Sequence, residues 1–153
     1  MPRRDPQEPT IATNKTAFHD YIVVERFEAG ISLAGTEVKS CRERLVQLGE
    51  SFARIENGEA LVYNLHIAAY GFGNRFNHEV KRPRRLLMHK KEILKLGQWL
   101  GSKGGTLIPL KMYFKQGLVK VELAYCLGKT HGDQRDDIRR READRGIRRA
   151  LKN

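Results

Sequence analysis

The stretch from Lys81 to Lys95 carries the side chains of this sequence that are best suited to a chemical task. Seven of its fifteen residues are cationic and only Glu92 is acidic, a local charge of +6. The cations are Lys81, Arg82, Arg84, Arg85, Lys90, Lys91 and Lys95. Apolar residues between them, Leu86 to Met88, would hold these charges on a folded surface. Such a surface is typical of proteins that bind nucleic-acid phosphates.

Catalytic chemistry has little support in the sequence. The histidines form no HExxH motif and no paired metal spacing with a carboxylate, and they are His19, His66, His78, His89 and His131. Phosphate-loop, nucleophile-elbow and dinucleotide motifs are missing as well. His19 and Asp20 are neighbours, but on a strand they would point to opposite faces. We predict no enzyme, no catalytic residue, no metal and no cofactor; a metal-dependent nuclease with scattered carboxylates stays open.

Composition predicts one domain that binds a polyanion. The chain has 153 residues, 40% of them hydrophobic, a net charge of +11 and a pI near 10.0. Its apolar runs fall short of the roughly 18 to 20 residues that a membrane helix needs, and its first residues resemble no secretion signal. We therefore predict a cytoplasmic protein without a membrane partner, whose Cys41 and Cys126 are reduced and buried.

Local patterns predict the elements that must position the basic segment. Residues 1–16, with three prolines, read as a mobile arm, and order is expected to begin with a strand at Tyr21–Val24. Ala34, Val38, Cys41 and Leu45 share one face of a predicted helix. A hairpin is expected from 52–56 and 59–63 around Asn57-Gly58, followed by an irregular stretch at 71–85. A helix is expected at 89–100, ended by Gly101 and Gly104. Two strands, at 106–115 and 118–127, are expected to be joined by Gln116-Gly117.

The two last strands alternate apolar and polar residues, so each is expected to have one buried and one wet face. The predicted fold is mainly β with flanking helices: an OB-like antiparallel β-barrel over residues 17–127. Residues 128–153 hold nine Lys+Arg and five Asp+Glu with a narrow apolar strip. We expect this C-terminal tail to be disordered when free and helical on a partner.

Ten segments together carry a family resemblance. They are Asn14–Ala17, Asp20-Tyr21, Phe27–Ile31, Leu33–Ser40, Arg84–Ile93, Thr106–Leu110, Tyr113–Lys115, Lys120–Leu123, Gly128-Lys129 and Asp133–Arg135. In this order they resemble the small protein B family, bacterial proteins that bind transfer-messenger RNA in ribosome rescue. The resemblance covers nearly the whole chain beyond the first dozen residues.

The resemblance implies that the barrel binds the tRNA-like domain of transfer-messenger RNA at its elbow. The family's RNA-contacting positions match Glu28, Leu87 and His89. The full predicted RNA-binding set adds Lys15, Lys39, Arg82, Arg84, Arg85, Lys90 and Lys91. Simpler roles stay open for the first three: Glu28 as an ion-pair partner of Arg26 or Lys39, Leu87 as a core residue, and His89 as the start of a helix.

The resemblance also implies that the tail enters the decoding centre and mRNA channel of the small ribosomal subunit. Asp133 and Arg135 match the family's tail motif, whereas Gln134 replaces its lysine and Gly132 replaces a frequent histidine. The predicted ribosome-binding residues are Lys129, His131, Asp133, Arg135, Arg139, Arg141, Arg145 and Arg148. The expected protein is a monomeric adaptor that meets elongation factor Tu and alanyl-tRNA synthetase through its RNA. The alternative is a general OB-type single-stranded RNA-binding or ribosome-associated factor.

Overall fold

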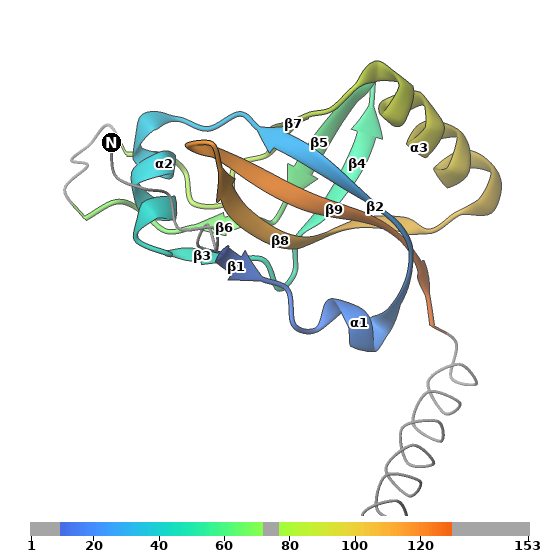
Figure 1. The fold of residues 1–153 in the computed structure, drawn as a ribbon, viewed down its shortest axis with the longest axis horizontal. Coiled ribbons are helices and arrows are strands. Elements are labelled where there is room, and N and C mark those ends of the chain that lie inside the picture. Colours follow the sequence, from blue (N-terminus) through green and yellow to red (C-terminus); the bar gives the residue numbers. More distant parts are fainter. Residues whose placement is uncertain (1–9, 72–76, 130–153) are drawn as a thin grey trace, which may run out of the picture.

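A computed structural model describes residues 10–71 and 77–129 of the chain (Figure 1). The strands are β1 (Thr10–Thr13), β2 (Tyr21–Ile31), β3 (Val46–Gln47), β4 (Phe52–Glu56), β5 (Glu59–Tyr63), β6 (His66–Ile67), β7 (Arg84–Leu87), β8 (Thr106–Lys115) and β9 (Leu118–Gly128). The helices are α1 (Ala17–Asp20), α2 (Gly35–Arg42) and α3 (Lys90–Lys103).

The main sheet closes into a ring. Its strands follow the order β8-β4-β5-β7-β2-β9, and β9 pairs with β8 again, while β1 joins β8 from outside the ring. All these pairs are antiparallel, and β3 and β6 form a separate two-stranded sheet. In Figure 1, α2 lies at one end of the barrel and α3 at the other. The predicted mainly β fold, an OB-like barrel with flanking helices, is confirmed.

Both predicted hairpins are present because their turn residues accept positive φ. Asn57 and Gly58 have φ of 51° and 76° between β4 and β5, and Gln116 and Gly117 have 52° and 79° between β8 and β9. Two consecutive residues in this region are the mark of the tight turn that suits twisted antiparallel strands. Local chemistry is sufficient to set both connections.

The prediction that β8 and β9 each have one solvent-exposed face is wrong in the middle of these strands. The register of β8 shifts between Pro109 and Lys111, and such a bulge changes the side to which the following residues point. Leu107, Met112, Leu123 and Tyr125 lie in the main core, whereas Ile108, Leu110, Ala124 and Cys126 form a second small core with Ala17 of α1. Both faces are therefore buried there.

The predicted mobile arm is wrong from residue 10 onward, and residues 1–9 lie outside the described part. β1 pairs antiparallel with β8, and Ile11 is buried in the main core. Asn14 is buried too, and its side-chain amide donates to the carbonyl oxygens of Pro109 (3.1 Å) and Leu48 (3.4 Å). A single inward isoleucine gives too short an apolar pattern to predict a strand.

The helix α2 is present, but its buried face differs from the predicted one. Glu37, Ser40 and Cys41 face the interior, whereas Leu45 lies beyond the helix and is exposed. The Ser40 hydroxyl donates to the carbonyl oxygen of Ala68 at 2.8 Å. A buried carboxylate is rare without a partner, and the cationic partners of Glu37 come from far along the chain.

The helix α3 runs past its predicted end. It continues through Gly101 to Lys103, and Gly104 follows with φ of 70°. Leu96 is its fully buried residue, and Trp99 packs on Tyr125 with ring centroids 5.1 Å apart. Gly104 supplies the positive φ that commonly ends a helix.

The two thiols behave as predicted. Cys41 and Cys126 are free and buried, and burial raises their pKa to about 12 and about 11. Neither thiol is ionised at neutral pH. Within residues 10–71 and 77–129 we find no helix that combines the length and apolarity of a membrane span.

Candidate nucleic-acid interface

Glu28 lies on the outer face of the barrel, because alternation along β2 turns Phe27 and Ala29 inward. Its cross-strand neighbour is Glu122 on β9, and two like charges in this position repel each other. Each carboxylate has its own cation. Arg26 Nη1 lies 3.2 Å from Glu122, and Lys115 Nζ on β8 lies 3.1 Å from Glu28.

A tyrosine completes the surroundings of Glu28. The Tyr113 hydroxyl donates to Glu28 Oε2 at 2.6 Å. This hydrogen bond, followed by that of Lys115, holds the pKa of Glu28 below its usual 4.5. Burial and the neighbouring carboxylate raise the pKa of Tyr113. Glu28 is thus a fixed anion that only accepts hydrogen bonds, as from base edges or sugar hydroxyls of RNA.

The simpler role given to Glu28 therefore needs correction. Its cation is Lys115, not Arg26 or Lys39, and the Lys39 ammonium lies 5.5 Å from the centre of the Tyr70 ring. Tyr113 and Lys115 are site residues that sequence reasoning missed. Both belong to the polar face of β8, but only the antiparallel order β2-β9-β8 brings that face within reach of Glu28.

Leu87 is exposed, with 52% of its surface accessible, so its alternative role as a core residue is wrong. It faces Gly30 across β7 and β2, and a Cβ atom on Gly30 would lie 3.3 Å from the Cβ of Leu87. A hollow of about 180 Å³ lies on one side of Leu87, lined also by Leu33, Val38, Leu118 and Val119. A second of about 260 Å³ includes Arg85, Met88, His89 and Ile93.

His89 stands where β7 ends and α3 begins. Its backbone N–H donates to Glu92 Oε1 at 3.2 Å, so the predicted role at a helix start is confirmed. The residue is exposed and lines the same hollow as Leu87. A ring at this place is able to stack on a base or donate to it.

Three exposed cations of the basic segment lie close to Leu87 and His89 in the sequence, and Arg85 lines the same hollow as these two residues. Lys90 and Lys91 are exposed in the first turn of α3, and neither has an acidic partner within the described ranges. Arg85 is exposed on β7 and lies 3.7 Å from Glu59, a loose contact. Exposed ion pairs contribute little to stability, so Arg85 is available to a phosphate as well.

The prediction that Arg84 binds RNA is wrong. Arg84 is wholly buried: its Nε pairs with Glu37, and Nη1 and Nη2 donate to the carbonyl oxygens of Leu65 (2.6 Å) and Val80 (3.0 Å). Burial alone would raise the pKa of Glu37, but hydrogen bonds from Arg82, Ala34 and Arg84 outweigh it and hold that pKa below 4.5. Side chains alternate between the two faces of β7. Because Leu87 is exposed, Arg85 is the exposed arginine of this strand and Arg84 is the buried one.

Arg82 is also occupied, since its guanidinium lies 2.5 Å from Glu37 Oε1. Lys95 pairs with Glu25 at 3.1 Å and covers the Trp99 ring, and Lys81 borders a separate hollow. The single electropositive surface expected from Lys81–Lys95 is therefore wrong. Two arginines anchor the segment in the fold, and Arg85, Lys90 and Lys91 remain beside Leu87.

The other predicted positions are spread over the chain. Lys15 is exposed between β1 and α1, and Lys39 is exposed on α2. Lys129 donates its backbone N–H to the carbonyl oxygen of Asp20 and its ammonium to that of Phe18, both at 3.0 Å. The remaining tail residues lie outside the described part: His131, Asp133, Arg135, Arg139, Arg141, Arg145 and Arg148.

Two observations bear on catalytic groups. His19 and Asp20 lie on α1 rather than on a strand, and His19 Nδ1 lies 3.0 Å from Asp20 Oδ1. The expectation that they point apart is wrong, although both side chains are largely exposed. Within the part of the chain that the structure describes, no three His, Cys, Asp or Glu side chains gather as a metal site would require.

Comparisons with known proteins give one family. The family model described as SmpB protein matches residues 11–153. The SsrA-binding protein of Carboxydothermus hydrogenoformans is 54% identical over 145 residues, which cover 95% of this chain and 97% of that protein. The SsrA-binding protein of Pelotomaculum thermopropionicum is 56% identical over 142 residues, covering 93% of each.

A solved structure agrees with this result. A chain of the structure described as "tmRNA-SmpB: a journey to the center of the bacterial ribosome" has a TM-score of 0.67 and 43% sequence identity. The match covers 86% of this chain and 96% of the other. Together with the family model and the curated relatives, this shows that the chain belongs to the SmpB family, the small protein B family that its motifs resemble.

Proposed function

We propose that this protein is the RNA-binding adaptor of trans-translation. It binds the tRNA-like domain of transfer-messenger RNA and delivers that RNA to stalled ribosomes, where the nascent chain is tagged and released. The names of its relatives, SsrA-binding proteins, and of the solved tmRNA-SmpB structure support this proposal. The barrel is the RNA-binding part, and the tail from residue 130 contacts the small ribosomal subunit at its decoding centre and mRNA channel.

The exposed Leu87 is the observation on the molecule that supports the proposal most directly. A leucine with half its surface accessible, between two hollows, suits an unstacked base better than a helical stem. The fixed anion Glu28 and the exposed His89 offer an acceptor and a donor, and Lys90 and Lys91 supply charge for phosphates. A bent tRNA-like joint displays unstacked bases and phosphates together.

The central experiment compares two RNAs of equal length, a folded tRNA-like domain and an unstructured strand, at one salt concentration. We expect the full chain to bind the folded RNA at least tenfold more tightly. Equal affinity would favour the general single-stranded RNA-binding factor. Labelled RNA incubated with the protein and Mg²⁺ should stay uncut, and cleavage would instead support a nuclease.

Salt dependence should reflect the number of cations that the structure leaves available. If Arg85, Lys90 and Lys91 meet phosphates, log affinity against log salt should fall with a slope of roughly −2 to −2.7. Binding isotherms at four or more salt concentrations give this slope. A value near zero would contradict the placement of the phosphates, and a much steeper one would show that further lysines, such as Lys15 or Lys39, take part.

Leu87→Ala should weaken binding of the tRNA-like domain by roughly tenfold to a hundredfold, because a base packed on a side chain contributes about 1 to 3 kcal/mol. Its free energy of unfolding should stay within about 0.5 kcal/mol of the original, since the side chain is exposed. Leu94→Ala is the matched control, an exposed leucine on α3 that lines neither hollow. Equal loss of affinity in the two variants would refute a specific role of Leu87.

The proposal also includes partners that act through the RNA, elongation factor Tu and alanyl-tRNA synthetase. In this proposal both act on the tRNA-like end of the RNA, so neither requires a surface on this chain. The cytoplasm, where stalled ribosomes occur, is the expected place of action.

A further inference from the structure

The outer face of β2, β9 and β8 carries two neighbouring carboxylates, Glu28 and Glu122, whose donors are divided between them. Arg26 Nη1 lies 3.2 Å from Glu122. Tyr113 and Lys115, both of β8, contact Glu28. Glu28 is the more accessible of the two side chains, at 41% against 27%. It is therefore the carboxylate that is better placed to meet a ligand.

The two contacts of Glu28 differ in kind. The Tyr113 hydroxyl donates to Glu28 Oε2 at 2.6 Å, a short charge-assisted hydrogen bond from a half-buried ring with few rotatable bonds. Lys115 Nζ lies 3.1 Å from Oε1 and 3.2 Å from Oε2, on a long, flexible and exposed side chain. Tyr113 therefore fixes the direction of the carboxylate, whereas Lys115 mainly adds positive charge.

Glu28 benefits from a partner that fixes its direction. Its side chain points outward from β2, and without a partner it would sample several rotamers and lose that freedom when RNA binds. A side chain that is already held in its bound orientation avoids this entropic cost. An ionised carboxylate has about four acceptor sites, so sites remain for a donor of the RNA beside those used by Tyr113 and Lys115.

Tyr113 also acts on the charge of Glu28. The titratable and charged groups around this carboxylate in the described part of the chain are Tyr113, Lys115, Lys120, Glu122 and Arg26. The hydrogen bond from Tyr113 is the largest cause of the lowered pKa of Glu28, ahead of the two lysines. Removal of the hydroxyl should therefore raise the pKa of Glu28.

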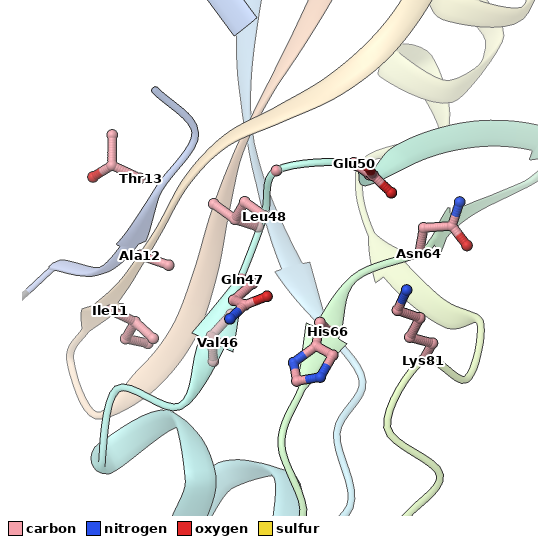
Figure 2. A pocket seen from close by; sticks show the side chains of 11 residues that line it. Ile11, Ala12, Thr13, Val46, Gln47, Leu48, Glu50, Asn64, His66 and Lys81 are labelled. Carbon is pink, nitrogen blue, oxygen red and sulfur yellow. The ribbon is translucent and has the colours of Figure 1, made fainter. Parts of the chain in front are cut away.

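Other glutamates of the barrel show how specific this arrangement is. Figure 2 shows Glu50 at the border of a hollow of about 600 Å³ beside β1, where within the described ranges no side-chain donor holds it. Glu56 does have a tyrosine partner, because the Tyr63 hydroxyl donates to its Oε2 at 2.9 Å on the β4–β5 hairpin. Neither residue of that pair lines a hollow beside Leu87. The Tyr63 bond is thus a natural reference for the Tyr113 bond.

We propose that Tyr113 is a positioning residue for RNA recognition. It holds the Glu28 carboxylate in one direction and in its ionised form, so that Glu28 accepts an N–H or O–H donor of the RNA without reorienting. Tyr113 acts through Glu28 and is not itself a contact to the RNA. The inference rests on the proposed RNA-binding function and adds a residue that this function requires.

The test is a double-mutant cycle of Tyr113→Phe and Glu28→Ala in the full chain, with affinity measured for the tRNA-like domain. Tyr113→Phe alone should weaken binding about tenfold, the usual effect of one charge-assisted hydrogen bond. In the Glu28→Ala background the same change should alter affinity less than about twofold, because the two residues act as one unit. An equal loss in both backgrounds, or no loss in the first, would overturn the inference.

Tyr63→Phe is the matched control, because it removes the same hydroxyl from the other tyrosine–glutamate pair. It should leave RNA affinity unchanged, and thermal unfolding of both variants checks that they fold alike. NMR titration of the Glu28 side-chain carboxyl carbon should give a higher pKa in Tyr113→Phe than in the original chain, and the original pKa in Tyr63→Phe. An unchanged pKa in Tyr113→Phe would contradict the positioning role.

The same measurements separate this inference from the proposed function. If the original chain prefers the tRNA-like domain to unstructured RNA and Tyr113→Phe binds it equally well, only the role of Tyr113 is wrong. If the original chain shows no such preference, the proposed function itself fails.

Discussion

Replacing Arg84 by methionine should lower the free energy of unfolding by about 3 to 5 kcal/mol, the usual cost of removing one partner from a buried ion pair. The change leaves Glu37 buried, with Arg82 as its remaining cation. It also removes the donors to the carbonyl oxygens of Leu65 and Val80. Denaturant titration measures the loss. The affinity of the folded fraction for RNA should stay within about twofold, since Arg84 is wholly buried.

The pH dependence of this effect identifies its electrostatic part. The pKa of Glu37 in the folded protein is below its ordinary value of 4.5. Ionised Glu37 therefore stabilises the fold above pH 4.5, and this contribution is lost as the pH falls through the lowered pKa. In the variant, burial acts on Glu37 with less opposition and the carboxyl takes up a proton more readily. The difference in stability between the two proteins should therefore shrink below pH 4.5.

Arg85→Met is the matched control, because Arg85 is the exposed arginine next in sequence. It should weaken RNA binding and leave stability within about 0.5 kcal/mol. The opposite pattern, in which Arg84→Met weakens RNA binding at unchanged stability, would contradict the assignment of Arg84 to the core.

Removing residues 130–153 should abolish tagging on stalled ribosomes and leave affinity for the tRNA-like domain within about twofold. The cut follows Lys129 because that residue holds the end of β9 to α1 through hydrogen bonds to Asp20 and Phe18. A cut at Gly128 would disturb the barrel as well. Tagging in a reconstituted translation reaction and RNA binding by the same preparation are the two measurements.

The complementary variant for this experiment is Leu87→Ala in the full chain, which should lower RNA affinity and tagging together. A tenfold loss of RNA affinity on truncation would instead show that the tail helps to form the RNA site. The proposal that the barrel alone binds the tRNA-like domain, while the tail contacts the ribosome, would then be wrong.

The parts of the fold that sequence predicts are those fixed by neighbouring residues. Asn57-Gly58 and Gln116-Gly117 define their hairpins because positive φ is a local property. The strand β1 is missed because its single inward residue, Ile11, has no local period. The bulge after Pro109 is missed because it depends on the partner strand.

The candidate site also has a part that the sequence predicts and a part that it does not. The family motifs indicate Glu28, Leu87 and His89, but their surroundings depend on contacts between distant segments. Glu28 and Tyr113 are 85 positions apart, and Arg84 and Glu37 are 47 apart. Charge alone cannot separate an arginine that anchors the core from its exposed neighbour. Alternation along β7 does so, once the strand is known to begin at Arg84.

The unequal strand pairing around the ring determines where the barrel opens most easily. β4 meets β8 through a single residue pair, Ala53 with Leu107, whereas β9 pairs along most of its length with both β2 and β8. The barrel therefore resembles a rolled sheet whose weakest junction is β4–β8, followed by β7–β2 with two residue pairs. Transient opening would begin at the β4–β8 junction, on the side of the ring opposite β2, and amide protons there would exchange first. The wall formed by β2, β9 and β8, which carries Glu28, Tyr113 and Lys115, would keep its shape during this opening.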